Sequence, residues 1–157
     1  MEHVKLGSWG LASDHDGHGY ATQWVWQYAL RFPAGQFAVV GVDSTHAHRM
    51  AAEVMEASPE DYRPKQRKVD RLLVYPNGAQ VAILAARLEM FKGPQFHGAW
   101  LDRPCEWKDP EVWTAFALCL RLGPAPAALI TQPGLGRQGL WGRVEARAWL
   151  DPVGGRC

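Results

Sequence analysis

The sequence has no lysine between Lys5 and Lys65, and this gap covers a glycine-studded loop at residues 7–19. A phosphate group held in that loop would have no ammonium partner from it. The chain has no apolar run of about 18 residues, so no segment is expected to span a membrane. The net charge is only +1, so no strong overall field favours nucleic acid or a membrane surface. The first six residues lack the apolar segment of a signal peptide, which argues against a secretory precursor.

What the chain does have is the composition and patterning of one α/β domain over residues 1–157. With 157 residues, 47% of them hydrophobic, it can build a proper core. Short apolar runs alternate with segments of helical periodicity, which predicts a mostly parallel sheet flanked by helices. The expected strands are residues 4–6, 37–42, 96–101 and 127–131, and the expected helices are residues 21–32, 46–57 and 110–122, the last capped by Asp109.

Two further segments complete the predicted architecture. Residues 71–85 are expected to form an inserted β-hairpin, because Asn77-Gly78 separates two apolar runs. The polar segment 60–70 before it is expected to be a loop. The Gly- and Arg-rich tail, about residues 135–157, has a weaker pattern and is expected to hold a short helix over about residues 140–150.

One acidic residue stands out at the end of an apolar run. Phe96–Leu101 is followed directly by Asp102. In parallel α/β sheets, ligands bind outside the carboxyl ends of the strands, so Asp102 is placed where a metal-holding or catalytic carboxylate would lie. The glycine-studded loop at residues 7–19 also lies between an expected strand and an expected helix, a pattern typical of a turn that cradles phosphate.

Histidines and an aspartate near two expected strand ends suggest a metal site. Both segments would lie at the same edge of the sheet, and this donor set suits zinc or another transition metal. Polar loop residues in solvent are the alternative interpretation. The candidate ligands are His15, Asp16, His18, His46 and His48.

The densest basic cluster of the chain lies in and after the polar segment 60–70. It predicts contacts to the phosphate backbone of DNA, and a solvated basic loop is the alternative. Its members are Arg63, Lys65, Arg67, Lys68 and Arg71.

In the order of these blocks, the chain resembles the ATPase core of large terminase subunits, which package DNA into the heads of bacteriophages and gene-transfer agents. The most specific block is Gly93-Pro-Gln-Phe96 followed by Ala99-Trp-Leu-Asp102. The other blocks are residues 37–55, the hairpin 72–85 with its Pro-Asn-Gly turn, Leu120-Arg-Leu-Gly123, and Leu129-Ile-Thr131 with Pro133.

This resemblance implies a P-loop NTPase fold that uses ATP and Mg²⁺, and an oligomer that moves duplex DNA. It also implies packaging proteins as partners (terminase, portal or capsid), no membrane partner, and a location in the host bacterial cytoplasm or on the virion. The nuclease domain that normally follows such a core is not expected in these 157 residues.

The glycine-rich loop departs from the family's phosphate-binding pattern. Gly17 stands at the position of the phosphate-binding lysine, and His18 stands at the position of the magnesium-binding hydroxyl, followed by Gly19. Asp14 and Asp16 lie where the loop should be electropositive, and they would repel a triphosphate. The nucleotide-binding set implied by the resemblance, Gly17, His18, Gly19 and Asp102, is therefore degenerate.

The segment after Asp102 departs as well. Arg103 stands where the family has the glutamate that polarises the attacking water, and an arginine remains protonated and cannot act as a base. Glu106 lies three residues on, beyond Pro104, and Thr131 is kept after the last expected strand. No catalytic residue is predicted with these departures, and Asp102, Glu106 and Thr131 are the candidates for relics of a catalytic set.

These departures predict a terminase-related pseudo-ATPase that acts by binding in or around viral DNA packaging. One alternative is the ATPase half of a split packaging motor that another subunit completes, with Arg103 or Arg137 acting in trans. Another alternative is a metal-binding or DNA-binding protein on the same fold. A third is a decayed prophage remnant without a present function.

Overall fold

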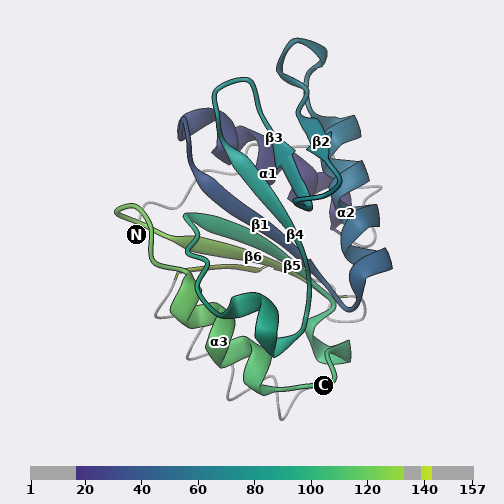
Figure 1. The fold of residues 1–157 in the computed structure, drawn as a ribbon, viewed down its shortest axis with the longest axis vertical. Coiled ribbons are helices and arrows are strands. Elements are labelled where there is room, and N and C mark those ends of the chain that lie inside the picture. Colours follow the sequence, from purple (N-terminus) through teal and green to yellow (C-terminus); the bar gives the residue numbers. More distant parts are fainter. Residues whose placement is uncertain (1–16, 133–138, 143–157) are drawn as a thin grey trace.

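The structure, a computed structural model, describes residues 17–132 and 139–142. Four parallel strands form the centre of its sheet in the order β4, β1, β5, β6 (Figure 1). Their bounds are Gln80–Ala85 for β4, Gln36–Gly41 for β1, Gly98–Asp102 for β5 and Ala127–Thr131 for β6. All five residues of β5 are buried, as expected for a central strand covered on both faces. The prediction of a largely parallel α/β sheet is confirmed.

Antiparallel strands extend the sheet at both edges. β3 (Leu72–Val74) pairs with β4 and β2 (Lys65–Arg67) pairs with β3, so the predicted hairpin is confirmed. The prediction of a loop over residues 60–70 is wrong in part, because β2 and the 3₁₀ turn η1 (Glu60–Tyr62) form there. At the other edge, β7 (Gly139–Gly142) pairs with β6, so the expected helix over residues 140–150 is wrong where the structure describes it.

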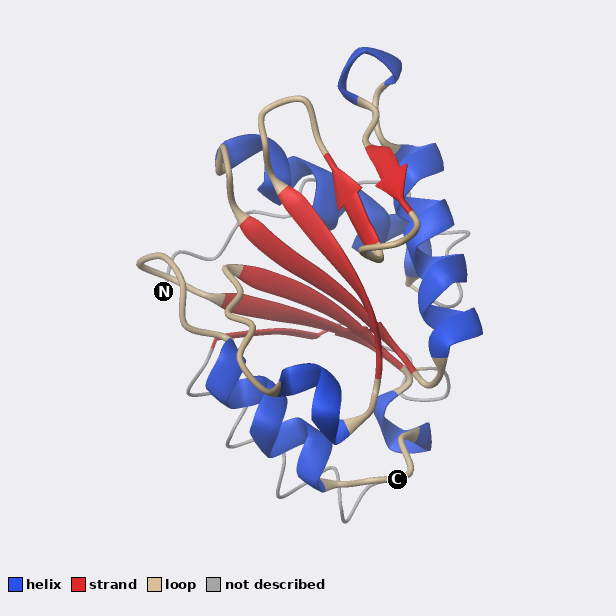
Figure 2. Ribbon diagram, in the orientation of Figure 1, coloured by secondary structure: helices blue, strands red, loops and turns tan. Residues whose placement is uncertain are grey.

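Helices cover the two faces of the sheet separately (Figure 2). α1 (His18–Arg31) and α2 (Ser44–Ala57) pack together on one face, over a core that includes Phe37, Val39 and Trp100. The other face carries α3 (Glu111–Cys119) and the 3₁₀ turns η2 (Leu88–Phe91) and η3 (Pro104–Glu106). Alternate residues of each strand supply the two cores, as the period of two in a strand requires.

The helices begin and end close to their predicted bounds, with local differences. α1 begins three residues before the expected Ala21, and α2 begins two residues before the expected His46. α3 ends at Cys119 because Leu120 leaves the helix to form a parallel bridge with Phe96. Pro110 takes the N-cap position, and the Asp109 carboxylate before it accepts from the backbone N–H of Glu111 at 2.9 Å, so Asp109 does satisfy a free N–H of the first turn. The expected strand at residues 4–6 and most of the glycine-studded loop lie outside the described residues.

The connections of the sheet create a crevice at its carboxyl edge. β1 continues into α2 on one face, whereas the neighbouring β5 continues through η3 to α3 on the other face. Adjacent parallel strands whose connections diverge in this way form a topological switch point, where α/β proteins bind ligands. No helix of the described residues has the length and apolar character that crossing a membrane would require.

Candidate functional site

The site is built around the side chain of Asp102, the last residue of β5, which is 0% exposed. Its register partner on β6 is Thr131, whose hydroxyl donates to Asp102 Oδ1 at 2.6 Å. Trp100 Nε1 donates in turn to the Thr131 hydroxyl oxygen at 2.9 Å. A buried carboxylate must be hydrogen-bonded to be tolerated, and these two strands supply part of what Asp102 needs.

Two histidines supply the rest, both to the second carboxylate oxygen. Asp102 Oδ2 lies 2.9 Å from His18 Nε2 and 2.8 Å from His46 Nε2. His18 is the first residue of α1, and His46 lies in the first turn of α2. Both helix starts lie at the carboxyl edge of the sheet, so three elements meet at one carboxylate.

His46 is held as a neutral donor. The backbone N–H of Val42 donates to His46 Nδ1 at 2.9 Å, so this nitrogen carries no proton. The ring proton must then be on Nε2, from which it is donated to Asp102. The Asp43 carboxylate caps α2 by accepting from the backbone N–H of His46 at 2.8 Å, and this places the ring.

His18 is held as a cation. Its Nδ1 lies 2.7 Å from Glu53 Oε2 and its Nε2 faces Asp102, so each ring nitrogen has a carboxylate acceptor. Burial alone would lower the pKa of His18, but the hydrogen bonds and charges of Asp102 and Glu53 outweigh it and raise that pKa to about 10. The ring also packs edge-on against Trp100, with the ring centroids 4.9 Å apart.

The same contacts keep Asp102 ionised. Burial alone would raise the pKa of Asp102, but hydrogen bonds from His18, His46 and Thr131 hold it well below its usual range. Oδ2 accepts two hydrogen bonds and Oδ1 accepts one. Three of the roughly four acceptor positions of this carboxylate are therefore occupied by donors of the protein itself.

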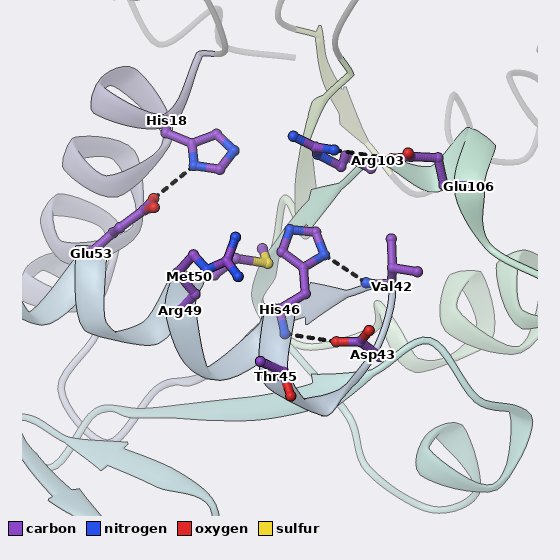
Figure 3. A pocket seen from close by; sticks show the side chains of 10 residues that line it. All are labelled: His18, Val42, Asp43, Thr45, His46, Arg49, Met50, Glu53, Arg103 and Glu106. Atoms are coloured by element: carbon purple, nitrogen blue, oxygen red, sulfur yellow. Dashed lines mark hydrogen bonds and ion pairs between the residues drawn. The ribbon is translucent and has the colours of Figure 1, made fainter.

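A pocket of about 400 Å³ opens next to this cluster, at the switch point between β1 and β5 (Figure 3). His18 and Glu53 border it on one side, and Arg103 and Glu106 border it on the other. Arg103 is in the left-handed backbone region, with φ 54°, and its guanidinium lies 3.6 Å from the Glu106 carboxylate. The full lining is His18, Val42, Asp43, Thr45, His46, Arg49, Met50, Glu53, Arg103 and Glu106.

The structure brings some of the predicted nucleotide-site residues together. His18, Asp102 and Thr131 form one cluster, and Glu106 faces the same pocket from η3. Gly17 has φ 79°, a left-handed conformation in which a lysine side chain would be strained. Gly19 is exposed on the first turn of α1, and its carbonyl accepts from the Thr22 hydroxyl.

Of the predicted metal ligands, His18 and His46 meet at Asp102, whereas His48 has other contacts. His48 Nδ1 lies 2.8 Å from the Ser44 carbonyl, away from the Asp102 cluster, and His15 and Asp16 lie outside the described residues. His46 presents a protonated Nε2, which has no lone pair for a metal. Within residues 17–132 and 139–142, no group of three or more His, Cys, Asp or Glu side chains is arranged to hold a metal ion.

The basic cluster lies on and around the edge strand β2, which β3 and β4 separate from β1 and the Asp102 site. All five side chains are exposed, and they belong to the β2–β3 hairpin and the segment before it. Arg67 pairs with Asp70 at 2.7 Å. The residues concerned are Arg63, Lys65, Arg67, Lys68 and Arg71.

Sequence reasoning missed Glu53 and Arg49, which line the pocket from α2. A usable signal was present, because Glu53 follows His46 by seven residues, or two helical turns, and Arg49 follows it by three. All three therefore lie on one face of α2. The role of Trp100 as a donor to Thr131 had no signal in the sequence, since it depends on the register of β5 against β6.

No protein-family model matches this chain, and no curated protein shows a significant match to it. The resemblance to large terminase subunits therefore rests on the sequence blocks alone.

Proposed function

We propose that this protein is a terminase-related pseudo-ATPase, a binding protein that keeps the α/β core and has lost nucleotide hydrolysis. Its partners would be packaging proteins: a terminase subunit, the portal or the capsid. The order of the sequence blocks supports the ancestry. The chemistry of the Asp102 cluster supports the loss of activity.

The observation that carries the proposal is the closure of Asp102 by its own protein. In an active site of this kind, the carboxylate would help to hold a magnesium ion. Here its oxygens accept from Thr131, His18 and His46, and its side chain is fully buried. The cation His18 neutralises the carboxylate where a metal ion would otherwise do so.

The residues at the positions that should act on the phosphates also support a loss of hydrolysis. The lysine position is occupied by Gly17 in a left-handed conformation, and the position of the catalytic glutamate is occupied by Arg103. A change of side-chain rotamer at Gly17 or Arg103 cannot supply the missing ammonium or carboxylate group. Within the described residues, no lysine lines the pocket.

Isothermal titration with ATP and Mg²⁺, with phosphate release measured on the same sample, tests the proposal. We expect no saturable Mg²⁺-dependent binding and no turnover by the folded chain. Magnesium-dependent binding with turnover would overturn it. Turnover that appears only after a second subunit is added would instead support the split-motor alternative.

DNA binding is a second candidate activity, favoured by the exposed basic side chains along β2. Losing a lysine contact to phosphate weakens binding about equally across sequences and lowers the salt slope by about 1. A gel-shift titration would compare Lys65→Ala and Lys68→Ala with Lys108→Ala, an exposed lysine outside the cluster. Equal binding by all three variants, or no salt-sensitive binding, would remove this candidate.

A further inference from the structure

We propose that the pocket at the β1–β5 switch point binds a compact oxyanion, a phosphate or a carboxylate, held by Arg49 and Arg103. The inference goes beyond the pseudo-ATPase proposal, since it requires neither a nucleotide nor terminase ancestry. It rests on the pocket, on the hydrogen-bond donors that face it, and on the internal hydrogen bonds of two acidic lining residues, Glu53 and Asp43.

The acidic side chains of the lining have partners within the protein. Glu53 accepts from His18 at 2.7 Å, and Asp43 caps α2 at the His46 N–H at 2.8 Å. Glu106 lies 3.6 Å from the Arg103 guanidinium. Glu53 and Asp43 are therefore hydrogen-bonded within the protein, whereas Glu106 faces Arg103 beyond hydrogen-bond distance.

The two arginines, in contrast, have donors to spare. Arg49 is exposed and has no ion pair with any residue in the described part of the chain. Arg103 contacts Glu106 at 3.6 Å and Asp102 at 3.9 Å, both longer than a hydrogen bond. Each guanidinium carries five N–H donors in a fixed fork that matches the oxygens of phosphate or carboxylate.

The two guanidinium groups face the same space from different elements. Arg49 comes from α2, which follows β1, and Arg103 directly follows β5, so the two lie on either side of the switch point (Figure 3). His18 and His46 also line this space, and both are hydrogen-bonded to the buried Asp102. Thr45 adds a hydroxyl to the rim. An acceptor-rich ligand of small size is the one that these donors would satisfy together.

The test is a titration of the whole chain with inorganic phosphate, followed by NMR of the arginine side chains and by calorimetry. Malonate and ATP with Mg²⁺ form parallel arms, which separate a phosphate ligand from a carboxylate ligand and from a nucleotide. The variants are Arg49→Ala and Arg103→Ala. The matched control is Arg121→Ala, an exposed arginine whose backbone N–H bonds to Phe96 at the opposite edge of the sheet.

We expect saturable binding of phosphate or malonate by the native chain and by Arg121→Ala. Each pocket variant should bind about tenfold more weakly or worse, since it loses charge-assisted hydrogen bonds. No saturable binding of either anion, or equal weakening in Arg121→Ala, would overturn the proposal. Hydrolysis in the ATP arm would contradict the pseudo-ATPase proposal alone and would leave the oxyanion site standing.

Discussion

At each end of β1 a backbone N–H donates to a histidine side chain, but the two histidines have different surroundings. At the amino edge, the backbone N–H of Gln36 donates to His97 Nδ1 at 3.0 Å. At the carboxyl edge, the backbone N–H of Val42 donates to His46 Nδ1 at 2.9 Å. His97 then packs against the rings of Phe32 and Phe37, whereas His46 turns its other nitrogen to the buried Asp102.

The difference shows what a histidine needs in order to take part in a charged site. Both rings satisfy a strand-end amide, which is a structural task. Only the carboxyl edge adds a fully buried carboxylate, a second histidine and Glu53. Such convergence is costly unless every group is paired, so the carboxyl edge is where a retained or altered function is expected.

The largest effect should come from removing the charge of Asp102. Asp102→Asn leaves the His18 cation buried without its main counter-charge, and we expect a loss of about 3–5 kcal/mol in the free energy of unfolding. Asp43→Asn makes the same chemical change at a helix N-cap, where Asp and Asn are equivalent, and should cost almost nothing. Urea unfolding of both variants measures the contrast. Similar small losses in the two would show that the Asp102 cluster carries little energy.

The second effect is a pH dependence specific to the carboxyl edge. The folded chain holds the His18 proton more tightly than the unfolded chain, whose histidine has a pKa near 6.5. The resulting stability is fully present below pH 6.5 and is lost as the pH rises through about 10. We expect the loss to be on the order of 2–4 kcal/mol.

The variant His18→Gln isolates this contribution, because other groups also titrate at high pH. Its unfolding free energy should be lower than that of the native chain at pH 6, and the two should converge toward pH 10. Parallel curves for the two proteins across this range would contradict a charged His18.

A smaller effect is expected at Glu53, the outer partner of His18. Its side chain is 35% exposed, so solvent screens the pair, and Glu53→Gln should cost about 1 kcal/mol. Glu56→Gln, on the exposed side of the same helix, is the matched control and should be nearly neutral. A double-mutant cycle between His18→Gln and Glu53→Gln measures the coupling directly, and additive effects would argue against the pair.

The smallest effect should occur at the amino edge. His97→Phe keeps the ring stacking but leaves the Gln36 N–H without its acceptor, at a cost of about 1 kcal/mol. The pH dependence between 6.5 and 10 should remain that of the native chain. A flattened pH profile in this variant would mean that His97, and not His18, is the charged histidine.

Much of the fold could be predicted from the sequence because local signals and the hydrophobic pattern agree. The Asn77-Gly78 turn identified the hairpin, and the apolar run before Asp102 identified a central strand. β2 had no such signal: its three residues are all polar and exposed, and only pairing with β3 makes them a strand. The early end of α3 depends on the long-range bridge between Leu120 and Phe96, which no helical pattern records.

The site could be predicted only in part. The sequence identified Asp102 by its place at a strand end, and it identified His18 and His46 as functional candidates. It could not show that both rings point at the same carboxylate oxygen. That arrangement depends on strand register, on the Asp43 cap and on the packing of α1 against α2. Histidine and aspartate also suggested a metal site. In the described residues, His18 and His46 are instead hydrogen-bonded to Asp102.

The closure of Asp102 by two histidines in opposite protonation states is tested most directly by nitrogen-15 NMR of the imidazole rings. The spectrum would be recorded at neutral pH with and without ATP and Mg²⁺. We expect His18 to be protonated on both nitrogens and His46 on Nε2 only, with neither changed by the nucleotide. A neutral His18 at pH 7, or release of either ring from Asp102 when ATP and Mg²⁺ are added, would contradict this account.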